Sequence, residues 1–299
     1  MRLNTKDLRN ERQWRASTGL TEILYANLLV LFIESYQILY GKHLAERLQN
    51  TGIEYCIKSE NDLLFYTLFA LKSGNTYDLL GIIFGMDASN AKRQFECGLE
   101  VLQHTLKEAG HMPVLELLNE VEAEEFLSQF EQIIIDVTEQ RIQRHENYEV
   151  QKEHYSGKQG AHTLKKLVIS DESRRINFLS ICYPGSIHDF NILKDIFKPF
   201  SACFEKANVR VDLGFLGFEK NYVTKELDIP HKKPKNGELT DEQKKENRQI
   251  ASKRIYVENS IGGMKRYRLL MERLRIHSFD LYDKAAAVCA GLWNYILAV

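Results

Sequence analysis

Four acidic residues lie at the ends or on the faces of elements predicted for the second half of this 299-residue chain. Asp136 ends the apolar run QIIIDV, Asp212 ends NVRVD, Asp189 begins a predicted helix, and Glu258 lies in another. Clustered carboxylates repel one another unless cations join them, and hard oxygen ligands favour Mg²⁺ or Mn²⁺ over Zn²⁺. Two such ions about 4 Å apart can activate a water or a 3′-hydroxyl and stabilise the leaving oxygen of a phosphodiester.

The elements that must position these acids follow one order. The pattern from residue 132 predicts a buried strand, a hairpin of two strands, a helix, a strand, a basic extended segment and a long helix. The hairpin strands are Leu164–Ser170 and Ile176–Cys182, and the long helix runs from Thr240 to about Leu270. This is the element order of a ribonuclease-H-like fold, which gathers acids from distant positions at one edge of its sheet.

A single acid at the end of a strand or helix is more simply explained as a surface cap. Four acids at these topological points favour one shared site. We therefore expect the four carboxylates to converge. We also expect like-charge repulsion to raise the pKa of at least one of them when no metal is bound.

The long helix carries a second signal. Arg254, Glu258 and Lys265 fall within about 40° of one another at 100° per residue, so they share one helix face. Two bases beside a metal-binding acid suit a phosphate lying across that face. For Arg254 and Glu258 alone, an exposed i,i+4 salt bridge is the simpler explanation.

Residues 61–105 predict three helices. One ends near Gly74, a short one runs from Thr76 to Gly85, and Asp87 or Ser89 caps a longer third. A short helix, a tight turn and a longer helix make the layout of a helix-turn-helix, although an ordinary helical bundle has the same spacing. The outward face of the third helix offers side chains that reach base edges and phosphates: Ser89, Asn90, Lys92 and Arg93.

Charge and cysteine patterns indicate the kind of partner and the cellular compartment. The net charge of −1 names no partner, but residues 231–270 carry eleven Lys or Arg against five acids, whereas residues 111–131 carry six acids and no base. A basic segment fits a polyanion partner, and a solvated charged face would look similar. Five scattered cysteines without CxxC spacing favour free thiols in a reducing compartment. The start lacks the apolar stretch of a signal peptide, and Ala285–Val299 is too short to span a bilayer, so we expect a soluble intracellular protein.

Six sequence blocks, in this order, resemble the DD(E) transposases of bacterial insertion sequences, in the group related to PIF/Harbinger elements. The blocks are IIIDVTEQRIQR, HYSGKQGAHTLKKLVIS, YPGSIHDFNIL, VDLGFLG, ASKRIYVENSIGGMKRYRLL and LWNYIL. Arg254, Glu258 and Lys265 also fit the Y-x2-R-x3-E-x6-K signature of the wider class. Ala251 stands at the Tyr position, a departure that removes any phosphate contact by that Tyr.

The resemblance implies a DNA transposase that binds Mg²⁺ or Mn²⁺ through Asp136, Asp212 and Glu258, with Asp189 as an accessory fourth acid. His188 would orient a water or a phosphate. The implied partners are double-stranded DNA, as terminal inverted repeats and target, and further copies of the chain assembled on DNA. The implied reaction is phosphodiester hydrolysis, followed by attack of the freed 3′-hydroxyl on target DNA without a covalent enzyme–DNA intermediate. The implied location is the bacterial cytoplasm.

Two other functions stay open at this point: a domesticated DNA-binding protein that has lost transposition, and a metal-dependent nuclease that cuts without joining. The expected fold class is α+β. An N-terminal helical region (1–55) and a helix-turn-helix domain (56–110) would be followed by an acidic connector (111–131) and a ribonuclease-H-like catalytic domain (132–299), a mixed sheet flanked by helices.

Overall fold

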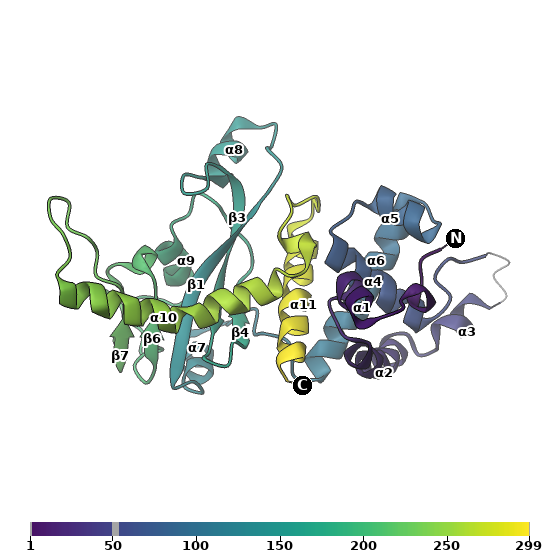
Figure 1. Cartoon of the computed structure of the whole chain (residues 1–299), viewed down its shortest axis with the longest axis horizontal. Coiled ribbons are helices and arrows are strands. Elements are labelled where there is room, and N and C mark those ends of the chain that lie inside the picture. The colour runs from purple at the N-terminus through teal and green to yellow at the C-terminus, as the bar shows by residue number, and fades with distance from the viewer. Residues whose placement is uncertain (1, 50–53, 299) are drawn as a thin grey trace. The chain divides into compact units, whose positions relative to one another are not determined.

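A computed structural model of the chain describes residues 2–49 and 54–298 (Figure 1). The fold is mixed α+β, as expected, and it divides into two compact units. One combines residues 1–112 with residues 264–299 and is helical; the other comprises residues 113–263 and contains the sheet. Each unit is described by itself.

Short polar caps and glycines set the helix ends in the helical unit. Thr21 accepts a hydrogen bond from the Leu24 N–H at the start of one helix, and Gly74 ends another in the left-handed conformation. The elements are η1 (Thr5–Asp7), α1 (Glu11–Thr18), α2 (Glu22–Tyr40), α3 (Leu44–Leu48), α4 (Glu60–Ser73), α5 (Tyr77–Phe84), α6 (Ala88–Glu108), η4 (Arg268–Leu270) and α11 (Phe279–Leu297).

The three predicted helices of residues 61–105 are α4, α5 and α6. Thr76 caps α5 and Gly85 ends it, as the sequence predicts. Asp87, rather than Ser89, caps α6, because its carboxylate accepts the Asn90 N–H. α4 and α5 both pack on α6, and the Tyr66 hydroxyl of α4 donates to the Ala91 carbonyl of α6 at 2.6 Å.

The C-terminal helix packs in the helical unit. The Asn294 amide donates to the His111 carbonyl and the Tyr295 hydroxyl donates to the Leu24 carbonyl, both at 2.9 Å. A Cβ on Gly291 would lie 2.9 Å from the Met112 sulfur, so the small residue permits this close approach. Residues 264–299 therefore pack with the N-terminal helices, which differs from the division expected from the sequence.

α2 is, in the part of the chain that the structure describes, the helix whose length and apolar composition would suffice to cross a membrane. Core helices of water-soluble proteins meet the same criterion. One face of α2, with Tyr25, Leu28, Phe32 and Tyr36, is buried within the helical unit, and 33% of its apolar window is buried in all.

The second unit is built on a mixed sheet (Figure 1). β1 (Gln132–Arg141) pairs antiparallel with β3 (Ala161–Ser170) and parallel with β6 (Asn208–Arg210), which pairs parallel with β7 (Glu226–Asp228). Three short strands pair with β3: β2 (Tyr155–Ser156), β4 (Ile176–Leu179) and β5 (Tyr183–Pro184). The other elements are α7 (Glu120–Leu127), α8 (Tyr148–His154), α9 (Asp189–Ile196), η2 (Leu213–Phe215), η3 (Phe218–Lys220) and α10 (Asp241–Met264).

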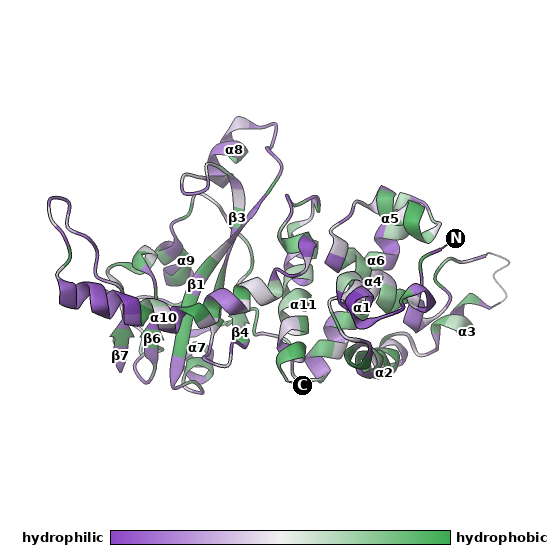
Figure 2. Cartoon of the chain, in the orientation of Figure 1, coloured by the Kyte–Doolittle hydropathy of each residue, from purple (hydrophilic) through white to green (hydrophobic). Residues whose placement is uncertain are grey.

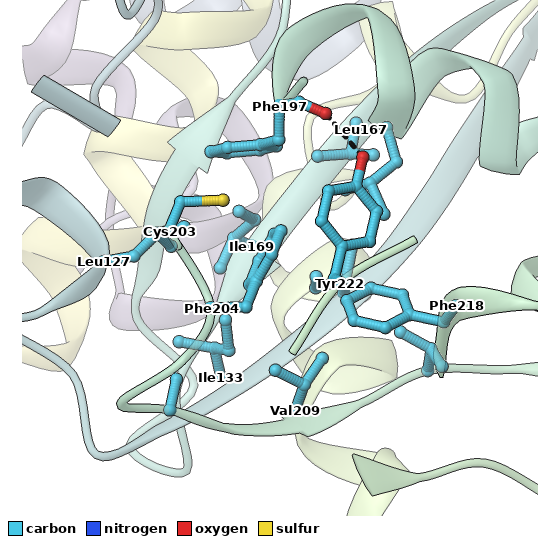
Figure 3. Packing of buried hydrophobic residues seen from close by; sticks show 14 of the residues in the cluster. Leu127, Ile133, Leu167, Ile169, Phe197, Cys203, Phe204, Val209, Phe218 and Tyr222 are labelled. Atoms are coloured by element: carbon cyan, nitrogen blue, oxygen red, sulfur yellow. Dashed lines mark hydrogen bonds between the residues drawn. The ribbon is translucent and has the colours of Figure 1, made fainter. Parts of the chain in front are cut away.

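Alternate residues of β1 face opposite sides of this sheet. Ile133 and Ile135 enter an apolar core that α7 and α9 complete. Figure 3 shows this core, with Cys203 and Phe204 packed beside Phe197 and Leu127. Asp136, next along the strand, points to the other side, where Arg254 of α10 reaches it. The sheet thus separates an apolar core from a charged face.

The acidic segment expected to be a connector is part of this unit. Ala123, Phe126 and Leu127 of α7 are buried in the core, and Val114 forms a bridge with Phe178. The six acids of this segment are exposed or half-buried, while apolar residues between them pack in the core. Cys203 in this core and Cys289 in α11 are buried free thiols, as the scattered spacing predicts.

Candidate active site

Parallel pairing of β1 with β6 brings Asp136 and Asp212 to the same edge of the sheet. Ile134 of β1 pairs with Arg210 of β6. Asp136 comes two residues after Ile134, and Asp212 comes two residues after Arg210. Residues two apart point to the same face, and neighbouring strands lie about 4.8 Å apart. The two carboxylates are therefore neighbours, although 76 positions separate them in the sequence.

Asp136 is largely buried, with 20% of its side chain exposed. Its Oδ1 accepts the Val137 N–H at 2.8 Å, and its Oδ2 lies 3.5 Å from the guanidinium of Arg254. Burial raises the pKa of Asp136 to about 6, with the nearby Asp212 charge adding to the rise and Arg254 and Lys158 opposing it. The expected rise in pKa is present, but burial is its largest cause and like-charge repulsion contributes less.

Gly214 lets Asp212 and Asp189 come close together. Asp212 Oδ1 accepts the Gly214 N–H at 2.8 Å, capping η2. A Cβ on Gly214 would lie 2.8 Å from Asp212 Oδ1 and 3.4 Å from Asp189 Oδ2. The two carboxylates thus flank the same small space, which any side chain at position 214 would crowd.

Asp189 begins α9 and is buried, and its Oδ1 accepts a hydrogen bond from Lys165 Nζ at 2.8 Å. His188, just before it, caps the helix, because its ring nitrogen accepts the Phe190 N–H at 3.3 Å. That contact orients the start of α9. A role for His188 with water or phosphate stays a prediction.

Glu258 is exposed on α10, one helical turn after Arg254. Across residues 2–49 and 54–298, no group of three His, Cys, Asp or Glu side chains lies close enough to hold an ion. Asp136 and Asp212 follow neighbouring parallel strands, and Asp189 lies beside Asp212, so these three carboxylates share one end of the sheet without forming a closed ion site. Lys265 follows the last residue of α10, so the helical angle that placed it beside Glu258 does not apply.

Comparison with known proteins identifies the family. A family model described as DDE superfamily endonuclease matches residues 135–294, more than half of the chain. The chain belongs to the DDE superfamily of endonucleases. All four candidate acids lie in the matched range, which confirms the resemblance seen in the sequence.

A curated relative of this DDE endonuclease is the probable transposase for insertion sequence element IS702 from Microchaete diplosiphon. The two are 36% identical over 176 residues, which cover 58% of this chain and 59% of the relative. The match thus spans about three fifths of the relative's length. No solved structure matches the chain.

DDE endonucleases normally use divalent metals, and the donor set here suits them. Asp136, Asp212 and Asp189 offer carboxylate oxygens, the hard ligands that Mg²⁺ and Mn²⁺ prefer. Gly214 leaves space between two of the three. The chemistry of these ligands therefore suits a divalent ion, while the distances between the three carboxylates are too long to hold one as they stand.

Three charged residues around the acids of this DDE endonuclease escaped the sequence reasoning: Lys165, Glu139 and Lys158. Lys165 and Glu139 face each other across β1 and β3, both almost fully buried. The sequence HTLKKLVIS could have indicated Lys165, because it places a lysine within an apolar strand and a buried lysine is almost always paired with an acid. Lys158 gave none, because only the folded hairpin after β2 brings its charge near Asp136.

The candidate DNA-binding residues of the DDE endonuclease lie in the first two turns of α6. Ser89, Lys92 and Arg93 are exposed. Arg93 donates to the Asn90 amide oxygen at 2.7 Å, and Lys92 lies 3.7 Å from Glu96. These side chains rest on their own helix and are accessible to a partner.

Proposed function

We propose that this protein is a DNA transposase, which cuts and joins DNA at the ends of its element with divalent ions. The observation that carries the proposal is the pairing of β1 with β6, which sets Asp136 beside Asp212 within the range matched by the DDE family. The relative from Microchaete diplosiphon is named a probable transposase, which supports joining as well as cutting.

The sheet supports a ribonuclease-H-like catalytic domain. Strands β4 and β5, then β3, β1, β6 and β7, lie in that order, with antiparallel pairs on one side of β1 and parallel pairs on the other. The first acid is on the central strand and the second follows the adjoining parallel strand. We propose Asp136, Asp212 and Glu258 as the principal ligands and Asp189 as the accessory one.

A bound divalent ion would supply an activated water or 3′-hydroxyl and stabilise the leaving oxygen. Asp136 and Asp212 would hold it from the sheet, and Glu258 from α10. Arg254 precedes Glu258 by one turn of α10, and its guanidinium lies 3.5 Å from Asp136. Its Nε–H is buried and finds no acceptor among the described residues. A phosphate oxygen would satisfy that donor, which supports Arg254 as a phosphate contact.

Recognition of element ends is assigned to the helical unit. We propose that α5 and α6 act as a helix-turn-helix, with Ser89, Asn90, Lys92 and Arg93 toward DNA. Lys265 and the basic segment 231–270 would add phosphate contacts, and the N-terminal half of α10 is strongly hydrophilic (Figure 2). The partners are double-stranded DNA and further copies of the chain, because two ends must be joined. The bacterial cytoplasm is the proposed location.

The test is a cleavage and strand-transfer assay on a duplex that carries the DNA flanking the gene, in Mg²⁺ and in EDTA. We expect Mg²⁺-dependent cleavage and joined products with the wild type, and neither with Asp136→Asn. The matched control is Asp241→Asn, which neutralises a fully exposed acid at the start of α10. Cleavage without joining would indicate a nuclease, and DNA binding without cleavage a domesticated DNA-binding protein.

A further inference from the structure

Lys165 is a buried lysine that joins β3 to the start of α9. Only 7% of its side chain is exposed. Its Nζ donates to Asp189 Oδ1 at 2.8 Å and to the Ile187 carbonyl at 2.7 Å. The same nitrogen lies 3.8 Å from Glu139 Oε1. A buried charge is stable only when it is paired and hydrogen-bonded, and Lys165 meets both conditions through the residues that lead into α9.

The two oxygens of Asp189 have different neighbours. Oδ1 is bound to Lys165, whereas Oδ2 lies 3.4 Å from the point that a Cβ on Gly214 would occupy, beside Asp212. A carboxylate held this way cannot rotate freely. Its Oδ2 therefore borders the space beside Asp212, and its Oδ1 is engaged by Lys165.

Glu139 completes the arrangement on the far side of Lys165. Its second oxygen accepts the Thr163 hydroxyl at 2.9 Å. One lysine thus stands between two buried carboxylates, and its hydrogen bond goes to Asp189, the nearer one. Lys165 supplies a positive charge within the group of acids as well as a geometric anchor.

We propose that Lys165 is a positioning residue for the divalent-ion site: it ties up one oxygen of Asp189, so that Asp189 offers the ion only Oδ2. This inference rests on the proposed function, because it assumes that Asp189 joins Asp136, Asp212 and Glu258 as the accessory ligand of the ion. Lys165 also lowers the attraction of the site for cations by its own charge. Lys165 thus lowers the affinity of the site for ions while fixing the position of the Asp189 ligand.

The variant Lys165→Met keeps the length of the side chain and removes its charge and its donor. Loss of one positive charge beside a divalent ion, together with release of the second Asp189 oxygen, should tighten Mn²⁺ binding by about tenfold. Cleavage should fall, because the ligand is no longer fixed. A purely structural lysine would give the opposite sign for affinity, since a disturbed site binds ions more weakly.

Mn²⁺ affinity of the full-length protein is measured by electron paramagnetic resonance of free Mn²⁺, without DNA. Lys198→Met is the control, because it removes the same charge from an exposed position in the same unit and should leave the affinity unchanged. Lys165→Arg keeps the charge and should stay near the wild type. If Lys165→Met does not fold by circular dichroism, Lys165→Gln replaces it, since the amide retains a donor for the Ile187 carbonyl, and the same tightening is expected.

Unchanged or weaker Mn²⁺ binding in the folded variant overturns the positioning role. In that case the proposed function survives if the wild type still binds Mn²⁺ and cleaves DNA. A wild type that neither binds Mn²⁺ nor cleaves DNA removes the proposed function, and the inference about Lys165 falls with it.

Discussion

The carboxylate edge of the sheet and the outer face of α6 differ in how their charged groups are held. At the edge, Asp136 and Asp189 are mostly buried, and each is in contact with a cation, Arg254 or Lys165. On α6, Lys92 and Arg93 are exposed and rest on neighbours of their own helix. A buried charge depends on its partners and position, whereas an exposed one acts mainly through its sign. Substitutions should therefore have abrupt effects at the edge and graded effects on α6.

The largest effect is expected for Asp212→Asn. The amide keeps the size of the side chain and its acceptor for the Gly214 N–H, but removes a negative ligand. Cleavage in Mg²⁺ should fall by about 10³-fold or more. DNA binding in a gel-shift assay should persist, because the lost charge no longer repels phosphate.

Asp189→Asn should reduce the same cleavage rate less than Asp212→Asn, because Asp189 shares its charge with Lys165. If Asp189→Asn abolishes cleavage while Asp212→Asn retains most of it, the ranking of these two acids is wrong.

Gly214→Ala tests geometry without changing charge. The added methyl group would lie 2.8 Å from Asp212 Oδ1, too close to be accommodated without a shift. We expect cleavage to fall by about 10²-fold, as for other displacements of about 1 Å at a reactive centre. Gly237→Ala is the control, because a Cβ there would meet only Pro234 at 3.6 Å. Equal rates for the two variants would show that the space beside Asp212 is not needed.

The burial of Asp136 predicts a pH-dependent stability in metal-free protein. Its pKa of about 6 lies above the value of about 3.9 in an unfolded chain, so the folded state binds this proton more tightly. The contribution of Asp136 to stability is therefore full below pH 4 and is lost as the pH rises through 6.

Relative to the wild type, Asp136→Asn should gain about 2 kcal/mol in free energy of unfolding between pH 4 and pH 7. Urea denaturation in EDTA at both pH values measures this difference. A constant difference between the two proteins would mean that Asp136 titrates normally.

The smallest effect is expected on α6. Changing both Lys92 and Arg93 to Ala should weaken binding to element ends and make the plot of log affinity against log salt shallower by about 2, one unit per lost phosphate contact. The same double variant should leave Mn²⁺ binding unchanged. An unaltered slope would assign recognition to residues 231–270 or to the basic residues near the N-terminus, Arg2, Lys6, Arg9, Arg12 and Arg15.

The two regions also differ in how far the sequence predicts them. Caps such as Thr21, Thr76 and Gly85 act within one turn of chain, so their helix ends could be placed correctly. The neighbourhood of Asp136 and Asp212 followed from the element order, because parallel strands align their carboxyl ends at one edge.

Long-range packing was harder to predict. Buried residues lie around much of the circumference of α11, so its sequence pattern does not indicate which unit the helix joins. The hydrogen bonds of α11 to His111 and Leu24 place it in the helical unit. The Lys165–Asp189 pair links residues 24 positions apart through a strand and a helix start, which periodicity alone does not connect. The exposed place of Glu258 likewise depends on how α10 lies on the sheet.

The central claim, that the edge formed by β1 and β6 holds divalent ions, is tested most directly by Mn²⁺ titration of the full-length protein followed by electron paramagnetic resonance. The account predicts saturable Mn²⁺ binding to the wild type and to the Asp241→Asn variant. It predicts loss of that binding in the double variant that combines Asp136→Asn and Asp212→Asn. Binding that survives in the double variant, or that is absent from the folded wild type, would contradict it.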